Sequence, residues 1–140
     1  MTQVNFYTLP SSEPQSRLLF VCRLTEKAYS LGHRLHIQTD SPQQSKQLDE
    51  LLWQYAPNSF IPHGIREGDE DNADPVSIGT HLIAPHADVL INLAEQPCAA
   101  EGRFSRINEV ISADDDSLEQ GRARYRFYME KAYQIETFKL

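Results

Sequence analysis

The chain alternates short apolar runs with longer segments in which apolar residues recur every three or four positions. Short runs rich in β-branched and aromatic residues predict strands at Val4–Leu9 and His33–Thr39. The longer segments predict helices over Pro14–Leu31 and Asp40–Ala56. Each helix has one apolar face, formed by Leu18, Val21, Leu24, Ala28 and Leu31 in the first and by Leu48, Leu51, Leu52 and Tyr55 in the second.

The middle of the chain continues this pattern less regularly. The apolar run Ala87–Ala94 predicts a buried parallel strand, and Ile107–Ser112 alternates like another strand. The run Val76–Ile83 predicts an irregular or edge strand, whereas Asn58–Ile65 is too short and too broken by proline for a central strand. Between them, Arg66–Pro75 is predicted to be an acidic loop.

A last helix is predicted after the acidic sequence ADDDS, because carboxylates are favoured at a helix N-terminus. The final segment, Gln134–Leu140, is then a short strand or a tail. The alternation of strands and helices predicts βαβ units and a mostly parallel sheet. The chain has no internal repeat and no linker, so residues 1–140 are predicted to form a single α/β domain.

Composition and charge narrow the class of protein. A hydrophobic content of 40% is typical of a soluble globular protein, and no apolar run is long enough to span a membrane. The N-terminal sequence MTQVNFYTLP lacks the features of a signal peptide, so a cytoplasmic location is expected. The net charge of −7 argues against broad binding of nucleic acids. Cys22 and Cys98 have no CxxC neighbour, which indicates two buried, reduced thiols.

Motifs of common catalytic classes are missing. The chain has no GxxxxGK[ST] loop and no GxSxG motif, and the segment after the first strand, PSSEPQS, lacks the glycines of a dinucleotide-binding turn. A zinc site at His81 and His86 would need a third ligand. The histidines are better explained as locally bonded or partly exposed side chains: His33, His36, His63, His81 and His86. We therefore predict no catalytic residue, no cofactor and no metal.

The late segment SLEQGRARYRFYMEKAY, Ser117–Tyr133, concentrates arginines and aromatic residues in an otherwise acidic chain. The residues that helical spacing places on one stripe are Arg122, Tyr125, Arg126 and Met129. Arginine and tyrosine are favoured at binding hot spots, and a guanidinium group binds a carboxylate through two hydrogen bonds. The helix therefore either packs on the core with its arginines in solvent, or binds a short acidic peptide that has a hydrophobic end.

A second segment, Leu48–His63, contains the only tryptophan of the chain, Trp53, followed by Phe60 and Pro62. These apolar residues either belong to the ordinary core or form an exposed patch that docks a partner.

Six stretches of the sequence, in order, resemble the DNA polymerase III chi subunit family, an accessory of the bacterial clamp loader. They are FY.L at Phe6–Leu9, LDELLW at Leu48–Trp53, SFIPH at Ser59–His63, DVLINL at Asp88–Leu93, EVI at Glu109–Ile111 and DSL…RARY at Asp116–Tyr125. The resemblance covers nearly the whole chain, and its most specific part is the combination of LDELLW and SFIPH. It implies a non-catalytic adaptor with a Rossmann-like, three-layer α/β fold and no phosphate-binding loop.

The resemblance also implies partners. Members of this family pair with the psi subunit of the clamp loader, and they bind the acidic C-terminal tail of single-stranded-DNA-binding protein, which ends in phenylalanine. By position, the expected residues for the tail are Arg122, Arg124, Tyr125, Arg126 and Tyr128. Those expected for psi, or for a helicase that competes with psi, are Trp53, Phe60 and Pro62.

Arg122 matches the main tail-binding arginine of the family. The sequence departs from the family pattern at Glu119, where the type member has a lysine after DSL. We therefore expect tail binding that is weaker, or that is carried by Arg126. No direct contact with DNA or with a membrane is expected.

Two other hypotheses compete with the adaptor. A degenerate nucleotide-binding protein or small hydrolase would have a pocket at the carboxyl ends of the strands, after Leu9, Thr39 or Ala94. A direct nucleic-acid binder would stack bases on the aromatic residues of the late helix, and it would need more basic surface than this chain has.

Overall fold

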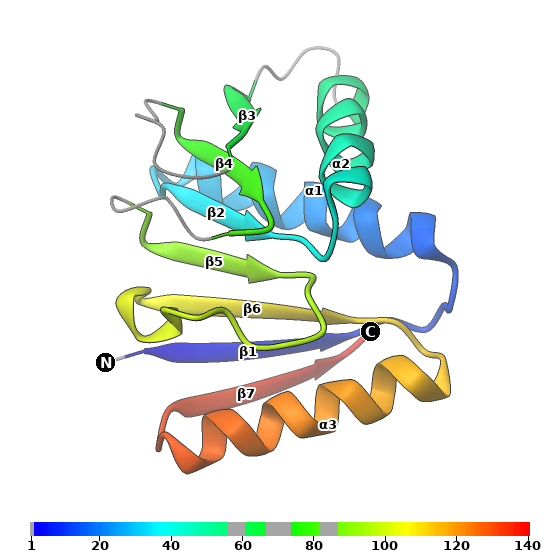
Figure 1. Ribbon diagram of the computed structural model, residues 1–140, viewed down its shortest axis with the longest axis vertical. Helices are drawn as coiled ribbons and strands as arrows, with labels where there is room; N and C mark the ends of the chain where they lie inside the picture. The colour runs from blue at the N-terminus through cyan, green and yellow to red at the C-terminus, as the bar shows by residue number, and fades with distance from the viewer. Residues whose placement is uncertain (1, 56–60, 67–73, 82–86) are drawn as a thin grey trace.

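The computed structural model describes residues 2–55, 61–66, 74–81 and 87–140, and a seven-stranded sheet forms its centre (Figure 1). The strands are β1 (Gln3–Thr8), β2 (Leu35–Gln38), β3 (His63–Ile65), β4 (Val76–Gly79), β5 (Val89–Asn92), β6 (Arg106–Ile111) and β7 (Gln134–Lys139). Their order across the sheet is β3-β4-β2-β5-β6-β1-β7. Every pairing in this sheet is parallel.

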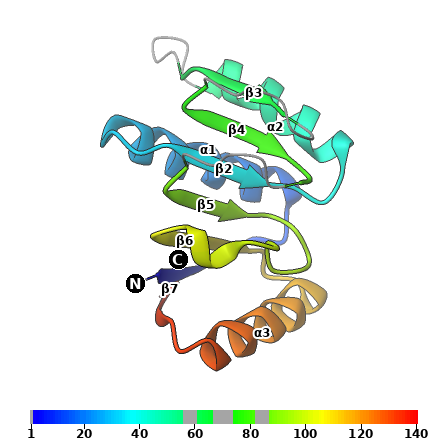
Figure 2. The same ribbon diagram turned by 60° about the vertical axis from the view of Figure 1, so that its left-hand side comes forward.

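Helices cover both faces of the sheet. Helices α1 (Pro14–Ser30) and α2 (Pro42–Tyr55) lie on one face, and α3 (Asp115–Glu130) lies on the other (Figure 2). A short 3-10 turn at Glu101–Arg103 precedes β6. The predicted three-layer α/β fold with a mostly parallel sheet is therefore confirmed.

The middle strands are short and fully buried. All residues of β2, β4 and β5 are buried, as expected for parallel strands covered on both faces. The core on the α1 and α2 side includes Val21, Leu48 and Ile37. A second core on the α3 side includes Phe6, Ile107 and Tyr128. Both predicted buried thiols, Cys22 and Cys98, lie in these cores.

Two local expectations were wrong. Strand β4, expected to be irregular or at an edge, lies inside the sheet, because β3 forms the edge beyond it. The position of β3 agrees with the expectation that its segment is not a central strand. The last residue expected on the apolar face of α1, Leu31, is 67% exposed. Leu31 is already the C-cap, and Gly32 follows it with φ +88°, a left-handed conformation that ends helices and suits glycine.

Because all strands are parallel, their carboxyl ends lie together at one end of the sheet. Helix α3 starts at this end, because it follows β6 after three residues, and it runs back across the sheet towards β7 (Figure 1). The C-terminal strand β7 then pairs with β1 along its whole length. The arginine-rich helix therefore lies over the strands from the first and last parts of the chain.

Candidate functional site

The N-terminus of α3 is set by Asp114. Its carboxylate accepts a hydrogen bond from the backbone N–H of Ser117 at 3.1 Å, so it acts as the N-cap. Asp115 and Asp116 follow in the first turn, where the helix dipole favours negative charge. The cap therefore fixes where the helix begins.

The buried face of α3 consists of Gly121, Arg124 and Tyr128. Gly121 allows a close approach to β6, because a Cβ atom at this position would lie 2.5 Å from Cδ1 of Ile111. This close approach puts the flank of the helix that carries Arg122 and Tyr125 directly beside the sheet.

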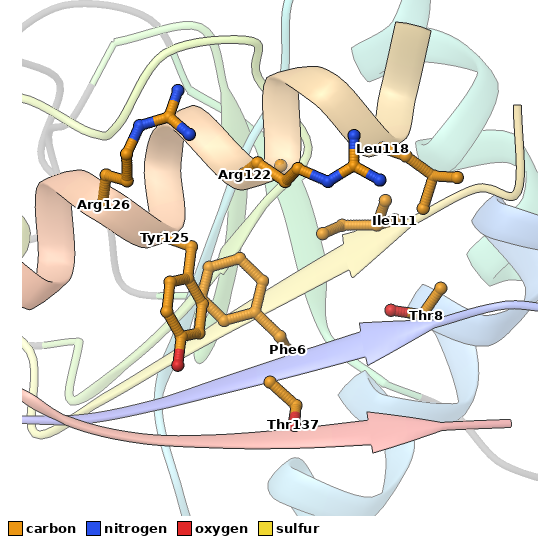
Figure 3. Close-up of a pocket in the computed structure, with 9 residues that line it drawn as sticks. Phe6, Thr8, Ile111, Leu118, Arg122, Tyr125, Arg126 and Thr137 are labelled. Atoms are coloured by element: carbon orange, nitrogen blue, oxygen red, sulfur yellow. The ribbon is translucent and has the colours of Figure 1, made fainter. Parts of the chain in front are cut away.

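A pocket of about 340 Å³ lies between that flank of α3 and the sheet (Figure 3). We call it the Arg122 pocket, and its lining residues are Phe6, Thr8, Ile111, Leu118, Gly121, Arg122, Tyr125, Arg126 and Thr137. The rings of Phe6 and Tyr125 are 5.4 Å apart and tilted by 53°. The pocket thus combines an apolar, aromatic wall with two guanidinium groups, which suits a ligand that is apolar at one end and anionic at the other.

The structure brings three of the predicted peptide-binding residues together in this pocket, namely Arg122, Tyr125 and Arg126. The strand residues that complete the pocket carry no signal in the sequence that marks them as part of a site. Phe6, Thr8 and Ile111 come from β1 and β6, and Thr137 comes from β7. Phe6 belongs to one of the stretches that resemble the family, but nothing in the sequence indicates that it lies against Tyr125.

The other two predicted peptide-binding residues lie inside the protein. Arg124 is 4% exposed and donates from Nε to Oε1 of Glu109 at 2.9 Å. Tyr128 is fully buried and donates its hydroxyl to Oε2 of the same carboxylate at 2.6 Å. Burial and the neighbouring Glu109 carboxylate raise the pKa of Tyr128, so the phenol stays protonated. In this structure the two side chains hold α3 on the sheet and do not form the wall of the Arg122 pocket.

A second hollow lies on the opposite flank of α3, and we call it the Phe127 groove. Its lining residues are Glu95, Gln96, Pro97, Glu119, Gln120, Ala123, Arg124, Arg126 and Phe127. Glu119, the departure from the family pattern, lines this groove and not the Arg122 pocket. Arg126 lines both hollows. The glutamate that replaces the family's lysine is therefore not in the lining of the Arg122 pocket.

The structure describes part of the second predicted surface, the one around Trp53. Trp53 is 48% exposed on α2, and its ring lies 4.2 Å from the ring of His63 at the start of β3. Pro62 precedes that strand and is half-buried, and Phe60 lies outside the described residues. Trp53 is thus an exposed aromatic residue beside the β3 edge, on the far side of the sheet from the Arg122 pocket.

Between the carboxyl ends of β2 and β5, the described residues leave little room for a nucleotide. A cavity of about 30 Å³ lies there, with Arg17, Asp40 and Leu93 in its lining. The guanidinium of Arg17 donates to the carbonyl oxygens of Val110 at 2.9 Å and of Leu93 at 3.2 Å. Ligand pockets are about ten times larger, so this cavity does not favour the nucleotide-binding hypothesis.

Comparison with known proteins agrees with the resemblance. The family model for the DNA polymerase III chi subunit, HolC, matches residues 1–136. The chain belongs to this family. DNA polymerase III subunit chi of Pseudomonas aeruginosa is 36% identical over an alignment that covers 100% of this chain and 98% of the relative. The Escherichia coli subunit chi is 24% identical, with 98% of this chain and 97% of the relative covered.

Membership of the chi family makes the chain a DNA replication subunit that belongs to the DNA polymerase III complex. The fold is also found in a solved structure of Saccharomyces cerevisiae Dbp5 bound to Gle1 and IP6, with a TM-score of 0.65 and 12% identity. That similarity covers 98% of this chain and 42% of the Dbp5 chain, and at this identity it concerns the fold alone.

Within the described residues, no group of three or more histidine, cysteine, aspartate or glutamate side chains is arranged to hold a metal ion. None of the described helices has the length and apolar character needed to cross a membrane.

Proposed function

We propose that this chain is a non-catalytic adaptor of the DNA polymerase III holoenzyme, and that its Arg122 pocket binds the acidic C-terminal tail of single-stranded-DNA-binding protein. The observation that carries the proposal is the pairing of an aromatic wall, Phe6 and Tyr125, with the guanidinium of Arg122 in one pocket. A terminal phenylalanine fits the apolar wall, and its carboxylate fits the guanidinium group.

Charge supports an acidic ligand at this position. The whole chain carries a net charge of −7, so it repels DNA and acidic peptides over most of its surface. Arg122 and Arg126 together give the Arg122 pocket a local positive charge. A local positive site on an acidic protein selects a short acidic segment over a long polyanion such as DNA.

We further propose that the surface around Trp53 binds the psi subunit, which would connect the chain to the clamp loader, or a helicase that competes with psi. Exposed tryptophan is enriched at protein interfaces, and Trp53 is exposed beside an edge strand of the sheet. The two surfaces lie at opposite edges of the sheet, because β3 and β7 are its two outermost strands. One chain of this shape could hold both partners at the same time.

A fluorescence-anisotropy titration tests the tail-binding proposal. A labelled acidic peptide that ends in Pro-Phe is titrated with the protein at two salt concentrations. We expect saturable micromolar binding that weakens with salt, and a loss of about ten- to a hundredfold in Arg122→Ala, since a hydrogen-bonded charge is removed. Arg23→Ala is the matched control, because Arg23 is exposed on α1 across the sheet. Absence of binding by the wild-type protein, or equal losses in the two variants, would refute the proposal.

A further inference from the structure

The Arg122 pocket lies next to one edge of the sheet. Strand β7 is the outermost strand on this side, and β1 is its single neighbour. Thr137, in the middle of β7, lines the pocket. A peptide whose end occupies the pocket can therefore leave it across β7 without meeting another strand.

The alternation of side chains along β7 places Lys139 on the same face as the pocket. Ile135 packs into the core on the α3 side, and Thr137 lines the pocket, so Lys139, two residues further on, has the same orientation. In the parallel register Lys139 is paired with Thr8, which also lines the pocket. Lys139 is not among the residues that line the Arg122 pocket, but strand register places it beside Thr8 on the same face, at the carboxyl end of β7.

Lys139 is available for a ligand. Among the residues that the structure describes, its ammonium group takes part in no salt bridge, whereas Lys131 is bound to Glu101 at 3.0 Å. The acidic residue of the same strand, Glu136, alternates to the opposite face. Phe138 is on that opposite face too, and its ring stacks on Tyr7 at 5.1 Å. The face of β7 that adjoins the pocket thus ends in an unpaired positive charge.

We propose that the acidic residues preceding the terminal aromatic residue of the bound peptide cross β7, and that Lys139 binds one of their carboxylates. This inference rests on the proposed function and adds the direction in which the bound peptide leaves the pocket. The terminal aromatic side chain contacts Phe6 and Tyr125, the terminal carboxylate binds Arg122, and the acidic residues before it run towards Lys139. The ligand class is an acidic peptide in which the negative charges precede an apolar C-terminal residue.

The test compares two lysine substitutions and two peptides. Lys139→Gln and Lys46→Gln change the net charge equally, and Lys46 is exposed on α2, on the other face of the sheet. One peptide carries the acidic residues and the terminal Pro-Phe, and the other keeps Pro-Phe behind neutral residues. Measured by anisotropy at low salt, Lys139→Gln should weaken binding of the acidic peptide by about two- to fivefold, the range of exposed ion pairs.

Lys139→Gln should leave binding of the neutral peptide unchanged, and Lys46→Gln should leave both affinities unchanged. Equal effects of the two substitutions on the acidic peptide would overturn the assignment of Lys139. In that case, wild-type binding and its loss in Arg122→Ala would leave the proposed function intact. If the wild-type protein binds neither peptide, the proposed function and this inference fail together.

Discussion

Arg124 and Glu109 form an ion pair inside the protein, with Nε and Oε1 at 2.9 Å and side chains that are 4% and 0% exposed. The second oxygen of Glu109 accepts hydrogen bonds from Tyr128 and from the side-chain amide of Asn92. One carboxylate on β6 therefore binds two residues of α3, one turn apart. This contact sets the rotation of the helix, and the rotation turns Arg122 and Tyr125 towards the pocket.

The first prediction concerns this ion pair. Glu109→Gln leaves the guanidinium of Arg124 buried without a counter-charge, so we expect the free energy of unfolding to fall by about 3–5 kcal/mol. Glu119→Gln removes an exposed carboxylate from the same helix and should change it by less than about 0.5 kcal/mol. Urea unfolding followed by circular dichroism measures both. Similar midpoints for the two variants would show that the buried pair does not hold α3.

The second prediction separates the residues that hold α3 from those that line the pocket. Tyr128→Phe removes the hydroxyl that donates to Glu109 at 2.6 Å, and it should cost about 1–3 kcal/mol of stability while leaving peptide affinity unchanged. Tyr125→Ala removes the ring beside Phe6 and should weaken peptide binding. A Tyr128→Phe variant that is fully folded and yet binds the peptide weakly would instead place Tyr128 in direct contact with the ligand.

The third prediction uses the close approach of Gly121 to Ile111. In Gly121→Ala the new methyl group conflicts with Cδ1 of Ile111, and the side chain must shift within the wall of the pocket that both residues line. Alanine favours the helix by about 1 kcal/mol, and a strained rotamer costs about as much, so stability should change little while peptide binding weakens.

Ile111→Val removes the conflicting Cδ1 atom and provides the control. Combined with Gly121→Ala, it should restore part of the lost affinity, and the double-mutant cycle should show coupling between the two positions. If the effects of the two substitutions on the free energy of peptide binding are simply additive, the two side chains do not meet in the way the structure describes.

The fourth prediction concerns pH and the cap of α3. The hydrogen bond from the backbone N–H of Ser117 lowers the pKa of Asp114 below its ordinary value of 3.8. The folded protein therefore binds this proton more weakly than the unfolded chain does. The stabilisation is complete above about pH 4 and is lost as the pH falls through the lowered pKa.

Thermal unfolding measured from neutral to acidic pH tests the direction of this pH dependence. The Tm of the wild type should exceed that of Asp114→Ala at neutral pH, and the difference should shrink towards acidic pH. Asp114→Asn keeps a capping side chain without the charge, so its Tm should lie between the two with no such pH dependence. A difference between wild type and Asp114→Ala that grows on acidification would contradict the assignment.

The fifth prediction tests the surface proposed for psi. Trp53 is the only tryptophan and is 48% exposed, so its emission reports on this surface alone. Burial under a partner should shift the emission of Trp53 to shorter wavelength when psi is added. The psi used for this test carries no tryptophan, so that all of the emission comes from Trp53. The acidic peptide should cause no shift, because the Arg122 pocket lies at the other edge of the sheet. A shift caused by the peptide and not by psi would reverse the two assignments.

Much of the fold can be predicted from the sequence because its signals are local. Apolar runs such as Ala87–Ala94 need no tertiary knowledge to be recognised as buried strands, and the acidic residues before α3 indicate its N-cap. The strand at His63–Ile65 could not be predicted, because three residues after a proline have too little pattern. Pairing with β4 is what makes them a strand.

For the candidate site, the sequence by itself determined that arginines and aromatic residues concentrate in one late helix of an acidic protein. It could not determine which of them face inwards. Arg122 and Arg126 are four residues apart and share one side of the helix, whereas Arg124 lies between them and points nearly the opposite way. The chemistry of the three side chains is the same. The tertiary structure decides between them, because Glu109 on β6 needs a buried cation and Arg124 is the arginine that the rotation of α3 brings to it. In the same way, only the parallel pairing of β7 with β1 brings Lys139 beside Thr8, since residues so distant in the chain meet through strand register alone.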